Sequence, residues 1–573
     1  MRSHPDPTAL GPVQGLVTLP SRIAAWRARR KVSPVWTAVV ALVLSLLLLP
    51  VATVLYLAGS TDLDALWHLA STVLPDALKE TVLLLIGAGV VTLVTGTATA
   101  WVVTMYRFPG RSMIDRLLII PLAMPTYIIA YAYVELLDYA GPIQSGLRHL
   151  FGWRTAADYW FPSVRSLGGA IMVLSAVLYP YVYLTARASF VQQSVCALEV
   201  ARTLGRTPFG AFTSVALPLA RPALVAGVSL VLMECLNDLG AVQHLGVRTL
   251  SSAIWTTWQQ RSSLGGAAQI ATVLLILVVA LFAIERGVRG GAQFHHSTGR
   301  YRAIPFADIT GWRAFLVAAV CAVPFVLGFL APALVLAHNA LRYLGDALEG
   351  GFWRAAWNSL LLAALAALAS AALGLLLAYA RRVAANGFTR PAVRVAGLGY
   401  ALPGTVLALG LFMPLAGLDI RIDAIMRSLT GISTGLMLSG TVLVLIIAYC
   451  VRFLAVSLGT IEAGLERISP NLDAAARTLG ETALSALWRV HLPLLVPAIG
   501  TAALLVFVDA MKELPATLLL RPFDFETLAT HVYSLVTAER PEAASVGALA
   551  IVAVGLVPVL LLHRAVAEGR AGH

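Results

Sequence analysis

The sequence predicts an all-α, polytopic membrane protein with about 12 transmembrane helices in two tandem halves of the same orientation. Three observations predict this class. Of the 573 residues, 59% are hydrophobic and only 12% are charged. Apolar runs of about 20 residues, long enough to cross a bilayer as helices, recur along the chain. One long pattern also occurs twice, which is typical of an internal duplication.

The apolar runs define the expected helices in order. We expect transmembrane helices at 35–58, 81–106, 117–137, 167–188, 220–240, 268–286, 314–337, 357–380, 396–416, 434–457, 493–512 and 545–563. The first run follows a basic segment that contains Arg27, Arg29 and Lys31. It is longer than the apolar core of a signal peptide, so we expect an uncleaved first helix.

Basic residues between the runs predict the orientation of the chain. Lys and Arg gather in cytoplasmic loops, so the N-terminus is expected in the cytoplasm. Counting spans from there also places 189–219, 286–311, 381–394, 458–492 and the C-terminus on that side, and most of these segments are rich in Arg. The net charge of +12 reflects this distribution and does not indicate nucleic-acid binding. We therefore expect a multi-pass protein of the bacterial inner membrane, surrounded by lipid, with both termini cytoplasmic.

The two halves correspond over most of their length. At a constant offset, Gly205 matches Gly480, Pro218 matches Pro493, Glu234 matches Asp509 and Asp238 matches Glu513; at a slightly larger one, Gly96 matches Gly374 and Pro125 matches Pro403. Six helices per half, an even number, predict the same orientation for both. The expected segments are a basic N-terminus (1–34), a first half (35–286), a cytoplasmic linker (287–313), a second half (314–565) and a cytoplasmic tail (566–573).

Two cytoplasmic loops, at 189–219 and 458–493, share one design. Ser469 followed by Pro470 predicts the start of a short helix, and Gly205 and Gly480 predict left-handed helix ends. A second short helix and a Leu-Pro pair then lead into the membrane. Such a helix–glycine–helix suits docking on a partner protein, the alternative being an amphipathic helix that lies on lipid.

The first loop, Glu199-x-Ala201-x-x-x-Gly205 followed by Leu217-Pro218, resembles the EAA loop of ATP-binding-cassette importer permeases. The second loop departs from it, because Ala474 stands at the Glu position and Asp473 precedes it. In that family these loops are coupling helices that fit clefts of the ATPase subunits. The resemblance implies ATPase-coupling roles for Glu199, Ala201, Leu204, Gly205, Pro218, Asp473, Ala474, Ala476, Leu479, Gly480 and Pro493. We expect the two loops to differ in charge.

The chain has no nucleotide-binding loop of its own. Its three lysines are Lys31, Lys79 and Lys512, and none belongs to a G-x-x-x-x-G-K-[ST] motif. We therefore expect a transport subunit that is not an enzyme and holds no cofactor. ATP–Mg is then bound by a partner, and two docking loops imply two copies of a cytoplasmic ATP-binding subunit.

The stretch at 509–545 resembles the fused permeases of iron(III) importers, and this implies iron(III) as substrate and a periplasmic or extracellular substrate-binding protein as partner. Permeases for thiamine, polyamines and phosphonates share much of the pattern, and these substrates remain alternatives. An ion-coupled secondary transporter is a further alternative, although it has no reason to duplicate the coupling loops. A membrane enzyme is disfavoured, because no HExxH or nucleophile-elbow motif occurs.

Four carboxylates are candidates for the translocation path. Glu234 and Asp238 lie four residues apart on one helix face, and Asp509 and Glu513 do the same in the other half. Ionisable residues at membrane depth usually face a pathway, and hard oxygen ligands suit iron(III) but attract organic cations equally. The alternative is that Asp238 and Glu513 are merely solvated at the outer ends of their helices, with Glu513 paired to Lys512 or an Arg.

A tyrosine-rich helix in the first half is a weaker candidate. It contains Tyr127, Tyr131, Tyr133 and Glu135, and tyrosine can ligate iron(III), but tyrosine at a membrane interface is ordinary. The four cysteines are scattered without a CxxC spacing and are interpreted as buried thiols. Because a strong site would slow release, we expect no stoichiometric metal site in the chain.

Overall fold

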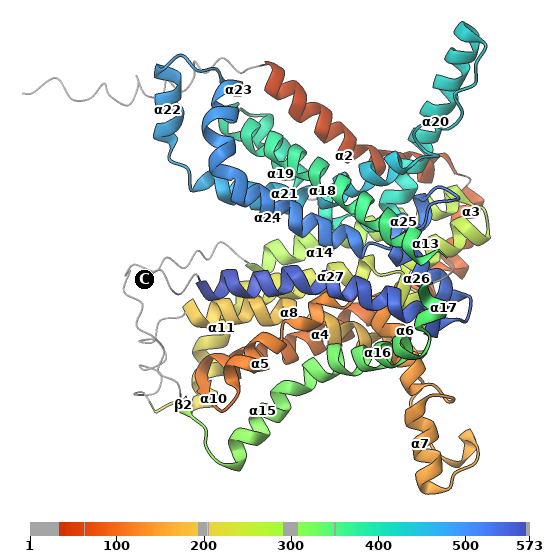
Figure 1. Cartoon of the computed structure of the whole chain (residues 1–573), viewed down its shortest axis with the longest axis vertical. Coiled ribbons are helices and arrows are strands. Elements are labelled where there is room, and N and C mark those ends of the chain that lie inside the picture. The colour runs from red at the N-terminus through yellow and green to blue at the C-terminus, as the bar shows by residue number, and fades with distance from the viewer. Residues whose placement is uncertain are drawn as a thin grey trace, which may run out of the picture.

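The computed structural model describes residues 34–568 except 62, 193–202, 204, 290–306, 349–350, 385 and 398. It is almost entirely helical (Figure 1). The first half contains α2 (Pro34–Ser60), α3 (Leu63–Thr72), α4 (Leu74–Met105), α5 (Arg111–Leu117), η1 (Ile120–Ala123), α6 (Thr126–Leu137), α7 (Pro142–Phe151), η2 (Ala156–Asp158), α8 (Leu167–Gln192), α10 (Pro208–Ala211), η3 (Phe212–Ala216), α11 (Leu217–Asn237), α12 (Gly240–His244), α13 (Leu250–Trp255), η4 (Thr256–Gln260) and α14 (Leu264–Arg289).

The second half repeats this order. It contains α15 (Trp312–Phe325), η5 (Val326–Leu330), α16 (Ala331–Arg342), α17 (Leu344–Leu348), α18 (Phe352–Val383), α19 (Thr389–Ala396), η6 (Gly399–Ala401), α20 (Gly404–Thr430), α21 (Val442–Glu466), α22 (Pro470–Thr478), α23 (Ala483–Ala486), η7 (Leu487–His491), α24 (Leu492–Met511), α25 (Pro515–Leu520), α26 (Leu528–Thr537) and α27 (Pro541–Glu568). Two short strands, β1 (Tyr106–Arg107) and β2 (Ala307–Asp308), pair in parallel.

Among the described residues, 11 helices are long and apolar enough to cross a membrane, and the number rises to 12 if one bent pair is a single span. The bent pair is Arg111–Ala123 with Thr126–Phe151, which meet at 97°. Met124 stands at the break in an extended conformation, as the residue before a proline prefers, and Pro125 precedes α6. The predicted all-α, polytopic class is confirmed.

Equivalent contacts recur in the two halves. The hydroxyl of Thr81 in α4 accepts the backbone N–H of Leu250 at 2.9 Å, and that of Ser359 in α18 accepts the N–H of Leu528 at 2.6 Å. Gly96 lies so close to α8 that an added Cβ would be 2.8 Å from the backbone nitrogen of Tyr183. Small residues thus let these helix pairs approach closely, as in other membrane bundles.

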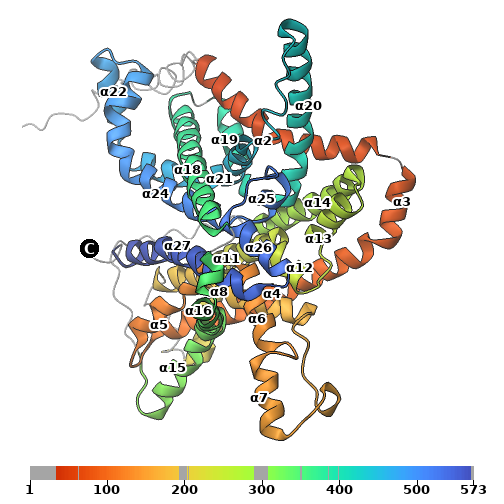
Figure 2. The ribbon, with the colours of Figure 1, turned by 45° about the vertical axis from the view of Figure 1, so that its right-hand side comes forward.

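The first span of each half crosses over to the other half. Helix α2 packs against α19 and α20 of the second half as well as α14 of its own, and the α15–α16 span packs against α5 and α6 of the first half (Figures 1 and 2). Gly410 of α20 has no room for a side chain, because a Cβ there would overlap the backbone of Pro50 in α2. The two halves are therefore interlocked.

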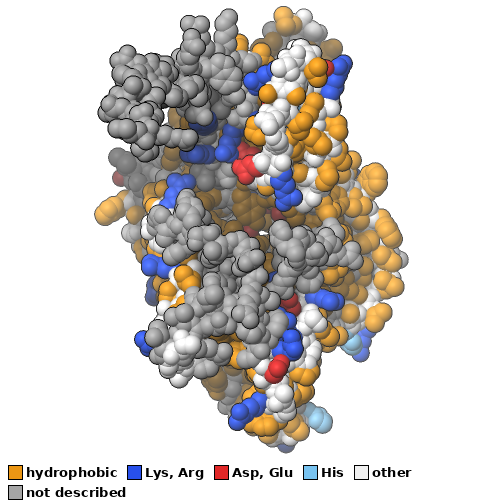
Figure 3. All heavy atoms as spheres, turned by 90° about the vertical axis from the view of Figure 1, so that its left-hand side faces the viewer, with side chains coloured by type: hydrophobic (Ala, Val, Ile, Leu, Met, Phe, Trp, Pro, Cys, Tyr) orange, Lys and Arg blue, Asp and Glu red, His pale blue; other side chains and the backbone are white. Residues whose placement is uncertain are grey.

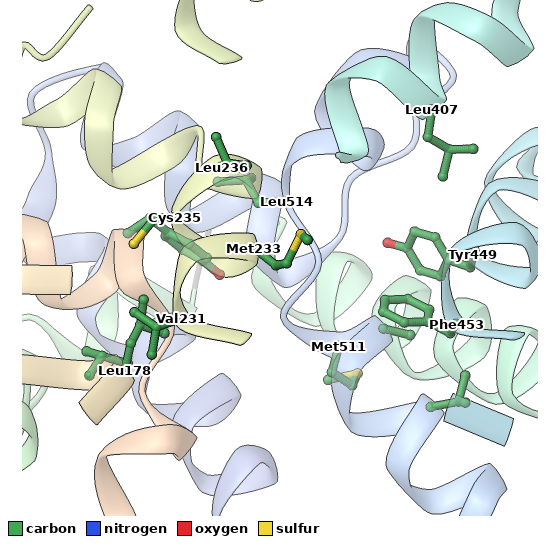
Figure 4. Close-up of a cluster of buried hydrophobic side chains, with 14 of the residues drawn as sticks. Leu178, Val231, Met233, Cys235, Leu236, Leu407, Tyr449, Phe453, Met511 and Leu514 are labelled. Carbon is green, nitrogen blue, oxygen red and sulfur yellow. The ribbon is translucent and has the colours of Figure 1, made fainter. Parts of the chain in front are cut away.

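The two halves also meet around α11 and α24. Buried apolar side chains from both halves surround these helices, among them Val231 and Met233 from the first and Phe453, Met511 and Leu514 from the second (Figure 4). This packing fixes the ends of α11 and α24, which carry the carboxylates considered next.

Candidate translocation cavity and coupling loops

A polar cavity of about 100 Å³ lies between the two halves. All four predicted carboxylates line it: Glu234 and Asp238 from the end of α11, and Asp509 and Glu513 from the end of α24. The duplicated helices therefore bring together residues that lie more than 270 positions apart in the sequence. Tyr127, Tyr181, Tyr400 and Asn237 supply further polar groups to the wall.

Glu234 and Asp509 are half-buried and each has one polar partner from a neighbouring side chain. The hydroxyl of Tyr400 donates to Glu234 Oε1 at 2.6 Å across the interface between the halves. Lys512 Nζ lies 3.0 Å from Asp509 Oδ1 within one helical turn, and the two side chains are 31% and 25% exposed. These two carboxylates keep part of their surface toward the cavity.

Asp238 and Glu513 have a different role. Asp238 accepts the backbone N–H groups of Ala241 and Val242 at 3.0 and 3.1 Å and a hydroxyl hydrogen bond from Thr126. Glu513 accepts the N–H groups of Ala516 and Thr517 at 3.0 and 3.1 Å. Each carboxylate thus satisfies the free donors at the start of the next short helix, α12 or α25. Both residues are buried, so the alternative of solvated carboxylates is wrong, whereas the pairing of Glu513 with an arginine is confirmed by Arg452.

Arg452 of α21 is a functional candidate that the sequence interpretation missed. Its guanidinium lies 3.4 Å from Glu513 and donates to Asn237 Oδ1 of the other half at 3.0 Å. The backbone N–H of Gly404 donates to the same oxygen at 2.8 Å. An arginine in the middle of the apolar run 434–457 was the available signal, because a charge at membrane depth usually marks a pathway or a buried pair.

The cavity therefore has an acidic excess. Four carboxylates face two cationic side chains, Arg452 and Lys512. Glu513 and Arg452 form one buried pair, with side chains 1% and 9% exposed, and Asp509 and Lys512 form a second pair. Glu234 and Asp238 are balanced by hydroxyl and backbone donors, which carry no charge. The electrostatic potential of this wall favours a cation over an anion.

The polar side chains of the tyrosine-rich helix, α6, contact different partners and do not gather at one site. Tyr127 lines the cavity, but the hydroxyl of Tyr131 meets Ser545 at 3.0 Å and that of Tyr133 donates to the carbonyl of Leu327 at 2.7 Å. Glu135 accepts from Asn339 at 2.7 Å. These three residues thus join α6 to the second half. Across the described part of the chain, no group of three or more His, Cys, Asp or Glu is arranged to hold a metal ion.

The second coupling loop has the local structure expected from its sequence. Ser469 caps α22 by accepting the N–H of Asn471. Gly480 adopts a left-handed conformation with φ of +82°, and the N–H groups of Gly480 and Glu481 bond to the carbonyls of Arg477 and Ala476. This is the Schellman ending for which glycine is favoured. Thr482 then caps α23.

The two faces of α22 differ. Leu472, Ala474 and Leu479 are exposed, and Leu479 is 83% exposed. Ala476 is buried, and Asp473 turns back toward the membrane helices, where it meets Arg382 and His491. The exposed leucines leave an apolar strip along α22. Lys and Arg side chains are spread among the described residues on the face of the molecule shown in Figure 3.

The first coupling loop is described only in part. Glu199, Ala201 and Leu204 lie outside the described residues. Gly205 adopts a left-handed conformation with φ of +80°, as expected, and Pro218 stands in the first turn of α11. In the second half, Pro493 occupies the same place in α24.

Two interlocked halves around a polar cavity, with a helix–glycine–helix loop in each half, define a polytopic membrane permease. The chain belongs to the family of binding-protein-dependent transport system inner membrane components, whose model matches residues 92–286 and 370–570. These two segments confirm both the expected family and the presence of two permease units in one chain.

Individual relatives transport different substrates. The chain is 26% identical over 495 residues, 85% of its length and 90% of the relative, to the Fe(3+)-transport system permease protein FbpB 2 of Haemophilus influenzae. It is 30% identical over 198 residues (34% and 68%) to a putative 2-aminoethylphosphonate transport system permease protein PhnU of Salmonella choleraesuis. It is 26% identical over 247 residues (42% and 86%) to the sulfate transport system permease protein CysT of Escherichia coli.

Proposed function

We propose that this chain is the membrane-spanning permease subunit of an ATP-driven importer and that its substrate is iron(III). The acidic excess of the cavity carries the proposal. A hard trivalent cation is favoured by carboxylate and phenol oxygens, whereas sulfate and phosphonate are anions that the same wall repels. The extent of similarity adds support, because the iron(III) relative aligns with most of this chain.

The coupling partners follow from the loops. The exposed strip of α22 suits docking of a cytoplasmic ATP-binding subunit on the second loop, and the first loop takes a second copy; those subunits hold ATP–Mg. The face with α22 and the loop of Gly205 is then cytoplasmic, and so are both termini. A periplasmic substrate-binding protein delivers the ion on the opposite face. The four carboxylates form the translocation path, with Glu234 and Asp509 as the groups that the ion meets.

Reconstitution tests this function. The chain is inserted into proteoliposomes with its ATP-binding subunit and substrate-binding protein, and uptake of labelled iron(III) is compared with that of thiamine, a polyamine, sulfate and 2-aminoethylphosphonate. We expect ATP-dependent uptake of iron(III) alone. Selective uptake of another solute overturns the substrate, and uptake driven by an ion gradient without ATP overturns the coupling.

A further inference from the structure

A buried ionic cluster joins the second coupling loop to the membrane helices. Asp473 of α22 accepts Nε of Arg382 at 2.8 Å through one oxygen and Nε2 of His491 at 2.7 Å through the other. A carboxylate can only accept, so His491 carries its hydrogen on Nε2. The side chain of His491 is fully buried, and those of Arg382 and Asp473 are 16% and 20% exposed.

Arg382 extends the cluster to a third helix. Its guanidinium also donates to the carbonyls of Leu465 and Ile468, at the end of α21, at 2.7 and 3.0 Å. The last turn of α18, the end of α21 and the first turn of α22 are therefore held by one planar, multidentate side chain. Such a geometry fixes orientation as well as distance.

His491 connects the cluster to the cavity. The helix from Ala483 to Met511 is continuous, with His491 near one end and Asp509 near the other. At 1.5 Å per residue, the 18 residues between them span about 27 Å. The ring of Tyr379 packs 5.3 Å from that of His491, and its hydroxyl donates to the carbonyl of Ala483 at 2.6 Å. A displacement of α22 thus acts directly on the helix that carries Asp509.

The first half lacks the residues for this cluster. At the corresponding positions it has Thr104 for Arg382, Leu198 for Asp473 and Ala216 for His491. None of these side chains is ionisable. The consensus glutamate of the loop shows the opposite pattern, because the first half has Glu199 and the second has Ala474.

We propose that Asp473, Arg382 and His491 form a mechanical link that carries the movement of the second coupling loop to α24 and the cavity. Asp473 is then a positioning residue that faces the membrane helices and not the ATP-binding subunit. Because the three corresponding positions of the first half hold no ionisable residue, this particular link is specific to the second half, and the two ATP-binding subunits act on the path through unequal connections. The inference rests on the proposed docking of α22 to an ATP-binding subunit.

The test compares uptake with ATP hydrolysis in the reconstituted complex. Asp473→Ala, Arg382→Ala and the double variant are measured for iron(III) uptake, ATP hydrolysis and the amount of ATP-binding subunit bound per permease. We expect uptake per ATP hydrolysed to fall roughly fivefold or more in each single variant, the size of a typical coupling free energy, with the subunit still bound. The double variant should lose no more than either single one, since both remove the same link.

Arg381→Ala is the matched control. Arg381 precedes Arg382 and pairs with Glu462 of α21 at 2.8 Å, and we expect this variant to keep the wild-type ratio. An unchanged ratio in Asp473→Ala overturns the link. Loss of the ATP-binding subunit from that variant also overturns it, because Asp473 would then be a docking contact. Failure of the proposed function is distinct, since the wild type itself would show no ATP-dependent uptake.

Discussion

Asp238 and Glu513 each accept two backbone N–H groups from the first turn of a short helix beside the cavity. Glu234 and Asp509 lie one helical turn earlier and have no such role among their described contacts. Residues of one chemical type on one helix face therefore divide into a structural pair and a pair that, under the proposed function, the solute meets. This division makes opposite predictions for stability and for uptake.

Glu513→Ala should destabilise the protein strongly. It leaves the guanidinium of Arg452 buried without its carboxylate, and breaking a buried pair costs about 3–5 kcal/mol. We expect a clearly lower Tm of the detergent-purified protein. Asp509→Ala is the control on the same half, because its pair with Lys512 is partly exposed, and it should lower the Tm much less. Equal Tm values for the two variants would contradict the assignment.

Glu234→Gln and Asp509→Asn should instead slow iron(III) uptake. Removing one charge from the wall weakens its attraction for a trivalent ion, and a loss of only about 1.4 kcal/mol corresponds to a tenfold lower rate, so uptake should slow roughly tenfold or more. The complex should still assemble, because neither variant breaks a helix start. Uptake is measured in proteoliposomes, and rates equal to the wild type in both variants would remove these residues from the path.

At the scale of single elements, the turn between α22 and α23 determines how the second coupling loop is presented. The turn after α22 depends on the left-handed Gly480, where an added Cβ meets no atom within 4 Å. A substitution there is therefore strained by its backbone conformation and not by crowding. The turn sets the angle between α22 and α23, and with it the orientation of the exposed leucines.

Gly480→Ala should cost about 1–2 kcal/mol locally and reduce uptake. The change favours another backbone conformation and so tilts α22 away from its docking position. Gly459→Ala is a suitable comparison, since Gly459 lies in α21 with ordinary helical geometry and open space around it. ATP hydrolysis stimulated by the substrate-binding protein is the measurement. If the two variants behave alike, the left-handed turn is not needed for coupling.

The turn between α25 and α26 should respond to acid. A hydrogen bond from His531, helped by Arg521, lowers the pKa of Glu526 from 4.5 to about 2. The folded form therefore gains stability from the ionised carboxylate at neutral pH, and this gain is lost as pH falls from about 4.5 through about 2. We expect amide exchange in 521–531, corrected for intrinsic rates, to rise over this range. Glu526→Gln should remove most of the difference between pH 6 and pH 3.

The class of the molecule could be predicted from its sequence because hydropathy and an internal repeat report directly on span number and duplication. The meeting of the four carboxylates followed from the repeat as well. Arg452 was missed because the sequence does not show which side chain pairs with an isolated arginine in an apolar run. The capping role of Asp238 was missed because the end of α11 at Asn237 is set by tertiary packing and not by a change in hydropathy.

The packing of α2 and of α15–α16 against the opposite half also could not be predicted from the sequence. Hydropathy identifies a span but not the helix it packs against, and that choice depends on fitted surfaces such as Gly410 against Pro50. The consequence for the whole molecule is that each half is completed by a helix from the other. The covalent linker is then not what holds the halves together.

Two separately expressed chains, cut within 290–306, should therefore assemble and co-purify. The same pair without residues 34–60 should co-purify in lower yield, because α19 and α20 lose the helix that covers them while the α15–α16 crossing remains. Affinity purification through a tag on one chain measures this directly. An unchanged yield after removal of 34–60 would show that the crossing of α2 contributes little to assembly.

The crossing also sets the order in which the protein is completed during synthesis. More than 300 residues separate Ser60 from Gly404, so at about 5–20 residues per second α2 precedes its partner α20 by roughly 20–70 s. The α15–α16 span meets α5 and α6 as soon as it is made. The first helix in the chain thus completes its set of neighbours only after part of the second half has been made. If synthesis stops after the first half, the surface of α2 that packs against α20 in the complete protein stays exposed to lipid.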